Sequence, residues 1–177
     1  MSACPSPGAR AALVCLDLQR GREAEATPAM LEACRLGLAA ARRRRWPVLH
    51  VHDRALGDAR PIEGLEPRPD EPVFQRRGPS AFSNPNFACA AVALGGPIAL
   101  IGFTLEDTVL ATTFACADRG LDVEVCLDAI AAGDHGPHAV SRVLLAPLRA
   151  LAPRVRLVEL DRLLAEDAGR FAAANLP

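Results

Sequence analysis

The sequence predicts a three-layer α/β/α protein in which helices cover both faces of a mostly parallel, Rossmann-like sheet. Short apolar runs alternate along the chain with segments of helical pattern, the order typical of right-handed β-α-β units. The first run, AALVCLDLQ at 11–19, is nearly continuous in its apolar character, as expected for a strand covered on both faces. In such sheets, binding sites gather outside the carboxyl ends of the strands.

The first half of the chain continues with a helix, a strand and a long loop. The helix at 28–44 has Pro28 at its start and ends in a run of arginines, which complement the negative end of the helix dipole. WPVLHVHD at 46–53 is the second predicted strand. Residues 54–87 are rich in proline, glycine and charge, so we expect a loop that belongs to a binding site or lid.

The second half repeats the alternation of helices and strands. The predicted elements are a helix at 87–95, a strand at 97–103, a helix at 107–119, a strand at 121–132, a helix at 137–151 and a last strand at 155–160. Gly120 follows the second of these helices, where a glycine commonly ends a helix. The strand ends predict that Asp17, the 54–87 loop and the 104–108 turn converge.

Length and composition favour one globular domain over residues 1–177. Half of the residues are hydrophobic and 23% are charged, and the formal net charge is −1. This charge gives no electrostatic reason to expect nucleic acid or an anionic membrane as a partner. The sequence has no signal-like segment and no apolar run of membrane-spanning length, which predicts a cytoplasmic protein. All 20 basic residues are arginine, so no lysine amine can act as a base.

The cysteines and histidines do not form a recognisable metal motif. The six cysteines are dispersed without a C-x-x-C pair, so we interpret them as buried free thiols: Cys4, Cys15, Cys34, Cys89, Cys116 and Cys126. His50 and His52 alternate along one strand before Asp53, but no third histidine follows nearby. His135 and His138 lie in a predicted solvent-exposed loop. We therefore expect neither a metal nor a cofactor.

Three segments resemble the isochorismatase-like, or cysteine hydrolase, superfamily. They are LDLQ at 16–19, RRGPSAF at 76–82, and Gly102 with its helix-opening turn and VLAT at 109–112. The resemblance covers nearly the whole chain and implies an isochorismatase-like architecture. It also implies a small-molecule ligand and a homo-oligomer, because members of this superfamily commonly assemble through their helices.

The resemblance also indicates where a catalytic centre would lie. The family's aspartate, lysine and cysteine positions fall on Asp17, Arg76 and Thr108, so only the aspartate is retained. A threonine or serine that normally stands three residues before the cysteine, next to a cis peptide, falls on Leu105. Four residues around these positions are expected to contact substrate: Gln19, Phe82, Thr104 and Leu105.

These substitutions change the chemistry that the site offers. A hydroxyl such as that of Thr108 needs a base within hydrogen-bond reach, and Asp17 is the obvious one. Pairing with Arg76 is expected to lower the pKa of Asp17 and weaken it as a base. Arg76 stays protonated, so it can bind an anion or an oxyanion but cannot relay protons.

The sequence leaves the function open. One hypothesis is divergent hydrolysis of a small amide, ester or vinyl ether; family members that cleave vinyl ethers lack the cysteine and protonate the substrate with the aspartate. A second is a catalytically silent member that binds a small molecule or a partner on the same scaffold. A third is a purely oligomeric, structural role.

Overall fold

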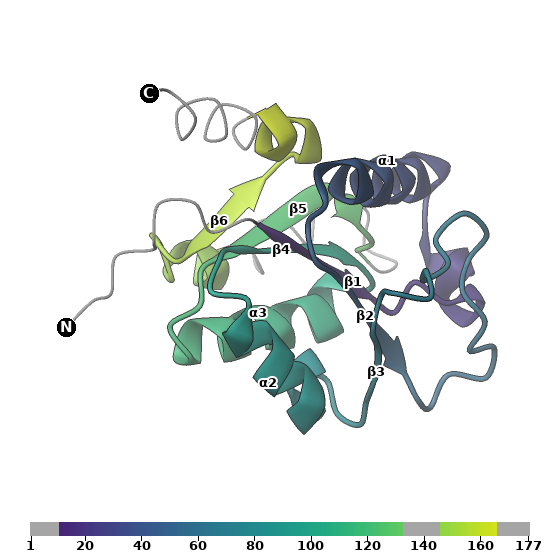
Figure 1. The fold of residues 1–177 in the computed structure, drawn as a ribbon, viewed down its shortest axis with the longest axis horizontal. Coiled ribbons are helices and arrows are strands. Elements are labelled where there is room, and N and C mark those ends of the chain that lie inside the picture. Colours follow the sequence, from purple (N-terminus) through teal and green to yellow (C-terminus); the bar gives the residue numbers. More distant parts are fainter. Residues whose placement is uncertain (1–10, 133–145, 166–177) are drawn as a thin grey trace.

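Six parallel strands form the centre of a computed structural model that describes residues 11–132 and 146–165. The strands lie in the order β3-β2-β1-β4-β5-β6 (Figure 1). Their bounds are β1 Ala12–Leu16, β2 Val48–Asp53, β3 Val73–Arg76, β4 Ile98–Gly102, β5 Val123–Ile130 and β6 Val155–Val158. The predicted three-layer fold with a mostly parallel sheet is confirmed.

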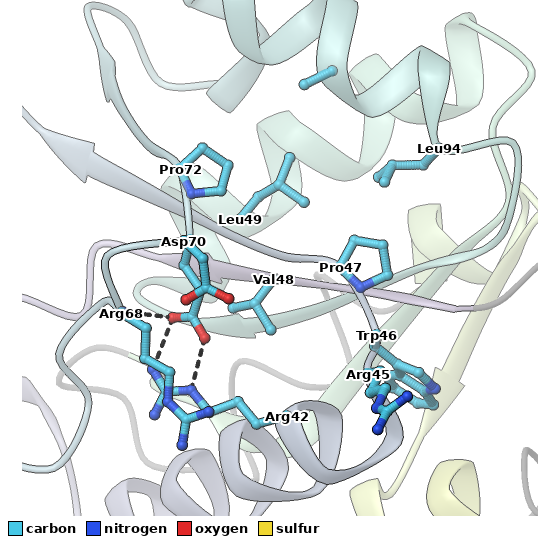
Figure 2. Close-up of a pocket in the computed structure, with 12 residues that line it drawn as sticks. Arg42, Arg45, Trp46, Pro47, Val48, Leu49, Arg68, Asp70, Pro72 and Leu94 are labelled. Atoms are coloured by element: carbon cyan, nitrogen blue, oxygen red, sulfur yellow. Dashed lines mark hydrogen bonds and ion pairs between the residues drawn. The ribbon is translucent and has the colours of Figure 1, made fainter.

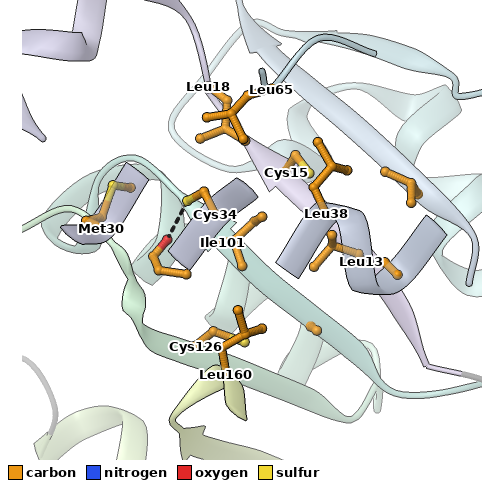
Figure 3. Close-up of a cluster of buried hydrophobic side chains, with 14 of the residues drawn as sticks. Leu13, Cys15, Leu18, Met30, Cys34, Leu38, Leu65, Ile101, Cys126 and Leu160 are labelled. Carbon is orange, nitrogen blue, oxygen red and sulfur yellow. Dashed lines mark hydrogen bonds between the residues drawn. The ribbon is translucent and has the colours of Figure 1, made fainter. Parts of the chain in front are cut away.

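Helices cover both faces of this sheet (Figure 1). The longer ones are α1 Pro28–Arg44 on one face, and α2 Pro85–Ala93 and α3 Leu110–Asp118 on the other; the short ones are η1 Arg20–Glu25, η2 Ala81–Ser83 and the π-helical turn η3 Leu105–Val109. Strand β1 contributes side chains to the cores on both faces of the sheet, because successive side chains of a strand point to opposite faces. Leu13 and Cys15 pack in the cluster under α1 (Figure 3), whereas Val14 and Leu16 pack in the cluster under α2 and α3.

The start of α1 agrees with its sequence signals. Thr27 is the N-cap, and its hydroxyl accepts a hydrogen bond from the backbone N–H of Met30 at 3.2 Å. Pro28 takes the first helical position, where its missing N–H would have no partner in any case. The helix ends at Arg45, which has a φ of 56°. The predicted bounds of 28–44 are confirmed.

The prediction of a loop over 54–87 is wrong in one respect, because this segment contains the strand β3. Val73–Arg76 pairs with β2 at the edge of the sheet, with Asp53 opposite Arg76. Helix α2 also begins earlier than expected. Asn84 is its N-cap and accepts hydrogen bonds from the N–H groups of Asn86 and Phe87.

Two other predicted helices differ in extent. The helix expected at 107–119 is η3 followed by α3, so Thr108 lies within a helical turn. Most of the helix expected at 137–151 lies outside the described residues. Residues 146–149, at its end, are described and are helical. Within the described ranges, no helix combines the length and apolar character that a membrane crossing requires.

The strand order reverses between β1 and β4. The chain runs outward from β1 through β2 to β3, then crosses back to β4 and runs outward in the other direction. Ligand sites of doubly wound sheets lie where the order reverses in this way. Gly102, at the end of β4, has a φ of 120°, and a Cβ there would lie 2.0 Å from the carbonyl oxygen of Leu16. The carboxyl ends of the two strands therefore pack too closely for a side chain at position 102.

Candidate active site

Asp17 follows β1 directly and points its carboxylate into the protein. The residue has a φ of 51°, and its N–H donates to the carbonyl of Val51 at 2.8 Å. The N–H of Gln19 donates back to the Asp17 carbonyl at 2.7 Å, which closes a tight turn. This turn leaves the Asp17 side chain fully buried. A buried carboxylate requires partners, because burial of an unpaired charge is costly.

Arg76, the last residue of β3, supplies most of these partners. Its Nε lies 3.0 Å from each of the two Asp17 carboxylate oxygens, and its Nη2 lies 2.9 Å from Oδ2. The same Nη2 donates to Asp53 at 2.7 Å, and Nη1 donates to the carbonyl of Gly78 at 2.9 Å. All three guanidinium nitrogens are thus engaged, and the residue is only 6% exposed. This arrangement fixes Arg76 in one orientation.

Thr108 approaches the same carboxylate from η3. Its hydroxyl donates a hydrogen bond to Asp17 Oδ2 at 2.9 Å, and the side chain is fully buried. The turn that carries it follows a cis peptide bond between Phe103 and Thr104. The structure therefore brings together the three positions that the sequence singled out.

The expected direction of the Asp17 pKa is wrong. Burial raises this pKa, and the hydrogen bonds from Arg76 and Thr108 and the nearby positive charges lower it only in part, so the carboxyl group lies above its ordinary value. The pKa of Arg76 is raised as well: burial lowers it, but the contacts with Asp17 and Asp53 outweigh that effect. The arginine therefore stays charged.

The four residues expected to contact substrate are all buried in the structure. Gln19 binds backbone: its amide oxygen accepts from the Asp53 N–H at 2.7 Å, and its nitrogen lies 3.3 Å from the carbonyl oxygens of Asp53 and Ala59. Phe82 packs edge-to-face on Phe87, with the Arg119 guanidinium 4.4 Å above its ring. Thr104 and Leu105 are 6% and 5% exposed. Their contact with a substrate stays a prediction.

Arg22 is a site residue that the sequence reasoning missed. It lies in η1, and its guanidinium is within 3.9 Å of Asp17 and 3.7 Å of Asp53. Its Nε is buried without a hydrogen-bond partner. The sequence could have indicated it by position. Arg22 follows Asp17 by only five residues, so it stays near the carboxyl end of β1. The Arg22 and Asp53 side chains, each 16% exposed, are more exposed than those of Asp17 and Arg76.

Four of the five described cysteines are buried and poorly suited to act as nucleophiles. Burial raises the pKa of the Cys34 and Cys116 thiols to about 12 and that of Cys15 well above its ordinary value; Cys126 is raised in the same way. A neutral, buried thiol is a poor nucleophile. Cys89 corrects the expectation of burial, because it is exposed on α2. Cys4 lies outside the described residues.

Of the two histidines of β2, His50 has a hydrogen-bond partner, whereas His52 Nε2 is buried without one. His50 Nε2 lies 2.9 Å from Glu71, and burial lowers the pKa of His50 in spite of this contact. Burial and the neighbouring His50 lower the pKa of His52 to about 4. Across the part of the chain that the structure describes, no three potential metal ligands lie together. The loop predicted to carry His135 and His138 is outside that part.

Comparisons with known proteins place this geometry in context. The profile of the isochorismatase domain matches residues 11–151. A putative hydrolase of the isochorismatase family from Chromobacterium violaceum superposes with a TM-score of 0.80 at 20% identity, covering 96% of this chain and 100% of that chain. MAR1 ribonuclease from Caenorhabditis elegans also gives a TM-score of 0.80, at 19% identity, over 94% and 88% of the two chains.

A third structure is YcaC from Pseudomonas aeruginosa, which was solved with hexane-2,5-diol and covalent acrylamide. It is 23% identical, with a TM-score of 0.75 over 93% of this chain and 86% of that chain. No curated protein matches the sequence. At these identities the solved structures establish the shared fold.

Proposed function

Because the chain belongs to the isochorismatase family, we propose that it is a catalytically silent member whose centre binds a small molecule without forming a covalent intermediate. One observation carries the proposal: Arg76 contacts both oxygens of the carboxylate that would serve as the base. The ligand would enter past Arg22 and Asp53, whose side chains are the more exposed ones at the centre.

The chemistry of the three residues supports this proposal. A thiol is partly ionised near neutral pH, whereas the Thr108 hydroxyl must transfer its proton as it attacks. Asp17 would have to accept that proton while it already accepts hydrogen bonds from Arg76. Arg76 cannot pass a proton on, because a guanidinium remains protonated. The family's covalent route thus lacks both its nucleophile and its proton relay.

A second candidate is slow hydrolysis through Thr108. It is favoured by the 2.9 Å hydrogen bond from the Thr108 hydroxyl to Asp17, which is the geometry of a nucleophile beside its base. The raised pKa of Asp17 makes that carboxylate a stronger base than an ordinary aspartate. Small amides, esters and vinyl ethers are the substrate classes to test.

The test compares wild type with Thr108→Cys and Asp17→Asn. The variants are made in a background that carries Cys4→Ser and Cys89→Ser, so that the remaining native cysteines are the buried ones. Each protein is incubated with a panel of small amides, esters and vinyl ethers, and with acrylamide as a thiol probe read by peptide mass spectrometry. We expect no turnover by wild type and acrylamide labelling at position 108 only in Thr108→Cys.

The outcomes separate the two candidates. Turnover by wild type that disappears in Asp17→Asn would overturn the proposal of a catalytically silent protein and support hydrolysis through Thr108. If Thr108→Cys folds but resists acrylamide, the centre does not admit small molecules, and the proposal of a ligand there is wrong.

We also propose that the protein is a cytoplasmic homo-oligomer formed by one domain per chain. Exposed apolar side chains support assembly through the helices: Leu36 on α1 is 53% exposed and Val92 on α2 is 55% exposed. Light scattering of wild type, Leu36→Glu and Val92→Glu tests this. A monomeric wild type would contradict it.

A further inference from the structure

A separate cavity lies at the amino ends of β2 and β3, whereas Asp17 lies at the carboxyl end of β1. Its volume is about 480 Å³, within the usual range for small-molecule sites. Its walls come from the end of α1, the first residues of β2, the segment before β3 and the end of α2 (Figure 2). We call this cavity the β2 groove. None of the Asp17, Arg76 and Thr108 side chains lines it.

The floor of the β2 groove is apolar and firmly supported. Its central residue is Leu49, which is 3% exposed and packs in the cluster under α2 and α3, whereas Val48, 6% exposed, points to the opposite face of the sheet. Pro47, Pro72 and Leu94 complete the apolar lining, and Figure 2 shows them around the space above β2. Two prolines and a buried strand form a surface with little conformational freedom. A ligand would therefore meet a largely preformed apolar floor.

Charge at the rim is unequally distributed. Glu71 is fully engaged by protein groups. Both of its carboxylate oxygens accept hydrogen bonds from Arg42 at 2.8 Å, and one also accepts from the Arg68 N–H at 3.0 Å and lies 2.9 Å from His50 Nε2. Arg42 is neutralised by this bidentate pair. Asp70 is the remaining acidic residue of the lining.

Two arginines of the rim remain available. Arg45 and Arg68 are both exposed, and within residues 11–132 and 146–165 neither guanidinium has an ion-pair or hydrogen-bond partner. Arg45 ends α1 and Arg68 lies in the segment before β3, so the two come from different walls (Figure 2). In this lining two unpaired guanidinium groups outnumber the Asp70 carboxylate, which leaves the groove attractive to an anion.

We propose that the β2 groove is a second binding site, for a small organic anion with an apolar, ring-sized body. The body would lie on Pro47, Pro72 and Leu94, and the anionic group would accept hydrogen bonds from Arg45 and Arg68. A carboxylate, sulfonate or phosphate shares the required chemistry, because each offers oxygens to a guanidinium fork. This site does not depend on the activity or inactivity of the Asp17 centre.

The protein contains its own reporter for this site. Trp46 is the single tryptophan of the chain and lines the β2 groove, where it is 4% exposed. The probe is 1-anilinonaphthalene-8-sulfonate, an aryl anion that accepts excitation energy from tryptophan. We expect saturable binding to the native protein with energy transfer from Trp46. Its neutral counterpart N-phenyl-1-naphthylamine, which lacks the sulfonate, should bind at least several-fold more weakly.

The matched variants are Arg45→Gln with Arg68→Gln, and Arg60→Gln as the control. Glutamine keeps the Cβ at the positive φ of Arg45, so no new backbone strain is introduced. Arg60 is an exposed arginine that pairs with Asp58 and does not line the β2 groove. We expect the double variant to weaken sulfonate binding about tenfold, since two charge-assisted contacts are lost, whereas Arg60→Gln leaves it unchanged.

Three results would overturn the proposal. They are equal binding by the double variant and the Arg60 control, equal binding of the charged and neutral probes, and binding without energy transfer from Trp46. Leu94→Asp gives an independent check, because a carboxylate on the floor should repel the anion. Circular dichroism and thermal melting of each variant confirm that it is folded before binding is measured.

Discussion

At the scale of single residues, Arg76 makes more contacts than its neighbours within the centre. A lysine ammonium is a compact charge, whereas the guanidinium of Arg76 spans Asp17, Asp53 and the carbonyl of Gly78 at once. Arg76 is therefore a fixed cross-link between the ends of β1 and β2 and the segment after β3.

Removing this cross-link should strongly destabilise the protein. Arg76→Met leaves the buried Asp17 with only the more distant Arg22 as a cation, and loss of one partner of a buried pair costs about 3–5 kcal/mol. Arg76→Lys should fall between wild type and Arg76→Met, because it keeps the charge but not the span. Urea unfolding measures both, with Arg77→Met, at an exposed neighbour, as the control. A loss in Arg76→Met no larger than in Arg77→Met would show that the pair is not a stabilising element.

The sequence predicted this cluster well but its electrostatics poorly. Asp17, Arg76 and Thr108 were identified because each lies at a recognisable position after a strand or in a motif. The direction of the Asp17 pKa was wrong because it depends on the balance of burial and pairing. Burial arises from η1 and the loop that pairs with it, where the N–H of Arg20 donates to Arg60 and that of Gly21 to Asp58. No local pattern encodes that coverage.

At the scale of elements, Glu71 connects three parts of the chain. It precedes β3, binds Arg42 of α1 and contacts His50 of β2. Burial alone would raise the pKa of Glu71, but hydrogen bonds from Arg42, Arg68 and His50 together lower it to about 2. The ionised carboxylate is thus part of how α1 is attached to the edge of the sheet.

This network predicts a specific response to acid. The folded-state pKa of Glu71 lies below that of the unfolded chain, about 4.3, so its stabilisation is present above that pH and is lost as the pH falls toward 2. Glu71→Gln should lower stability at pH 7 and flatten the decline between about pH 4.3 and 2. Urea midpoints across this range measure the effect, with Glu66→Gln, at an exposed neighbour, as the control. An unchanged slope in Glu71→Gln would contradict the pKa.

A second titration lies at higher pH and does not obscure the first. His52 has a lowered pKa of about 4, so stability linked to its neutral form is complete above the unfolded value of about 6.5 and declines below it. This decline begins before Glu71 starts to take up protons. The decline linked to His52 is therefore largely complete near pH 4, where that linked to Glu71 begins.

Element prediction succeeded where local signals were strong and failed where pairing decided the outcome. The bounds of α1 followed from Thr27, Pro28 and the arginines at its end. Strand β3 was missed because its four residues lie in a segment rich in proline, glycine and charge. Its identity comes from hydrogen bonds to β2, more than 20 residues away in sequence. A short edge strand carries too little pattern of its own to be recognised.

At the scale of the whole molecule, β1 and β4 set the geometry of the centre. Asp17 follows one and the turn with Thr108 follows the other, so the spacing of the two strands controls the 2.9 Å contact between them. That spacing depends on Gly102, which leaves room for the Leu16 carbonyl.

Gly102→Ala should therefore be severely destabilising. An added Cβ would meet backbone at 2.0 Å, and the φ of 120° is unfavourable for any residue with a side chain. We expect a loss of more than about 3 kcal/mol or failure to fold. Gly95→Ala is a suitable control, since Gly95 also has a positive φ of 67° but no atom within 4 Å of a new Cβ. Similar unfolding of the two variants would show that strain alone, and not close approach, explains Gly102.

The separation of the centre's residues along the chain has a consequence for biosynthesis. Arg76 is 59 residues from Asp17, and Thr108 is 91 residues away. A nascent polypeptide that has emerged only as far as α2 holds the acid and the guanidinium but not yet the alcohol. The centre is complete only after β4 and the turn with Thr108 have been synthesised. A product truncated before this turn therefore lacks one of the three side chains.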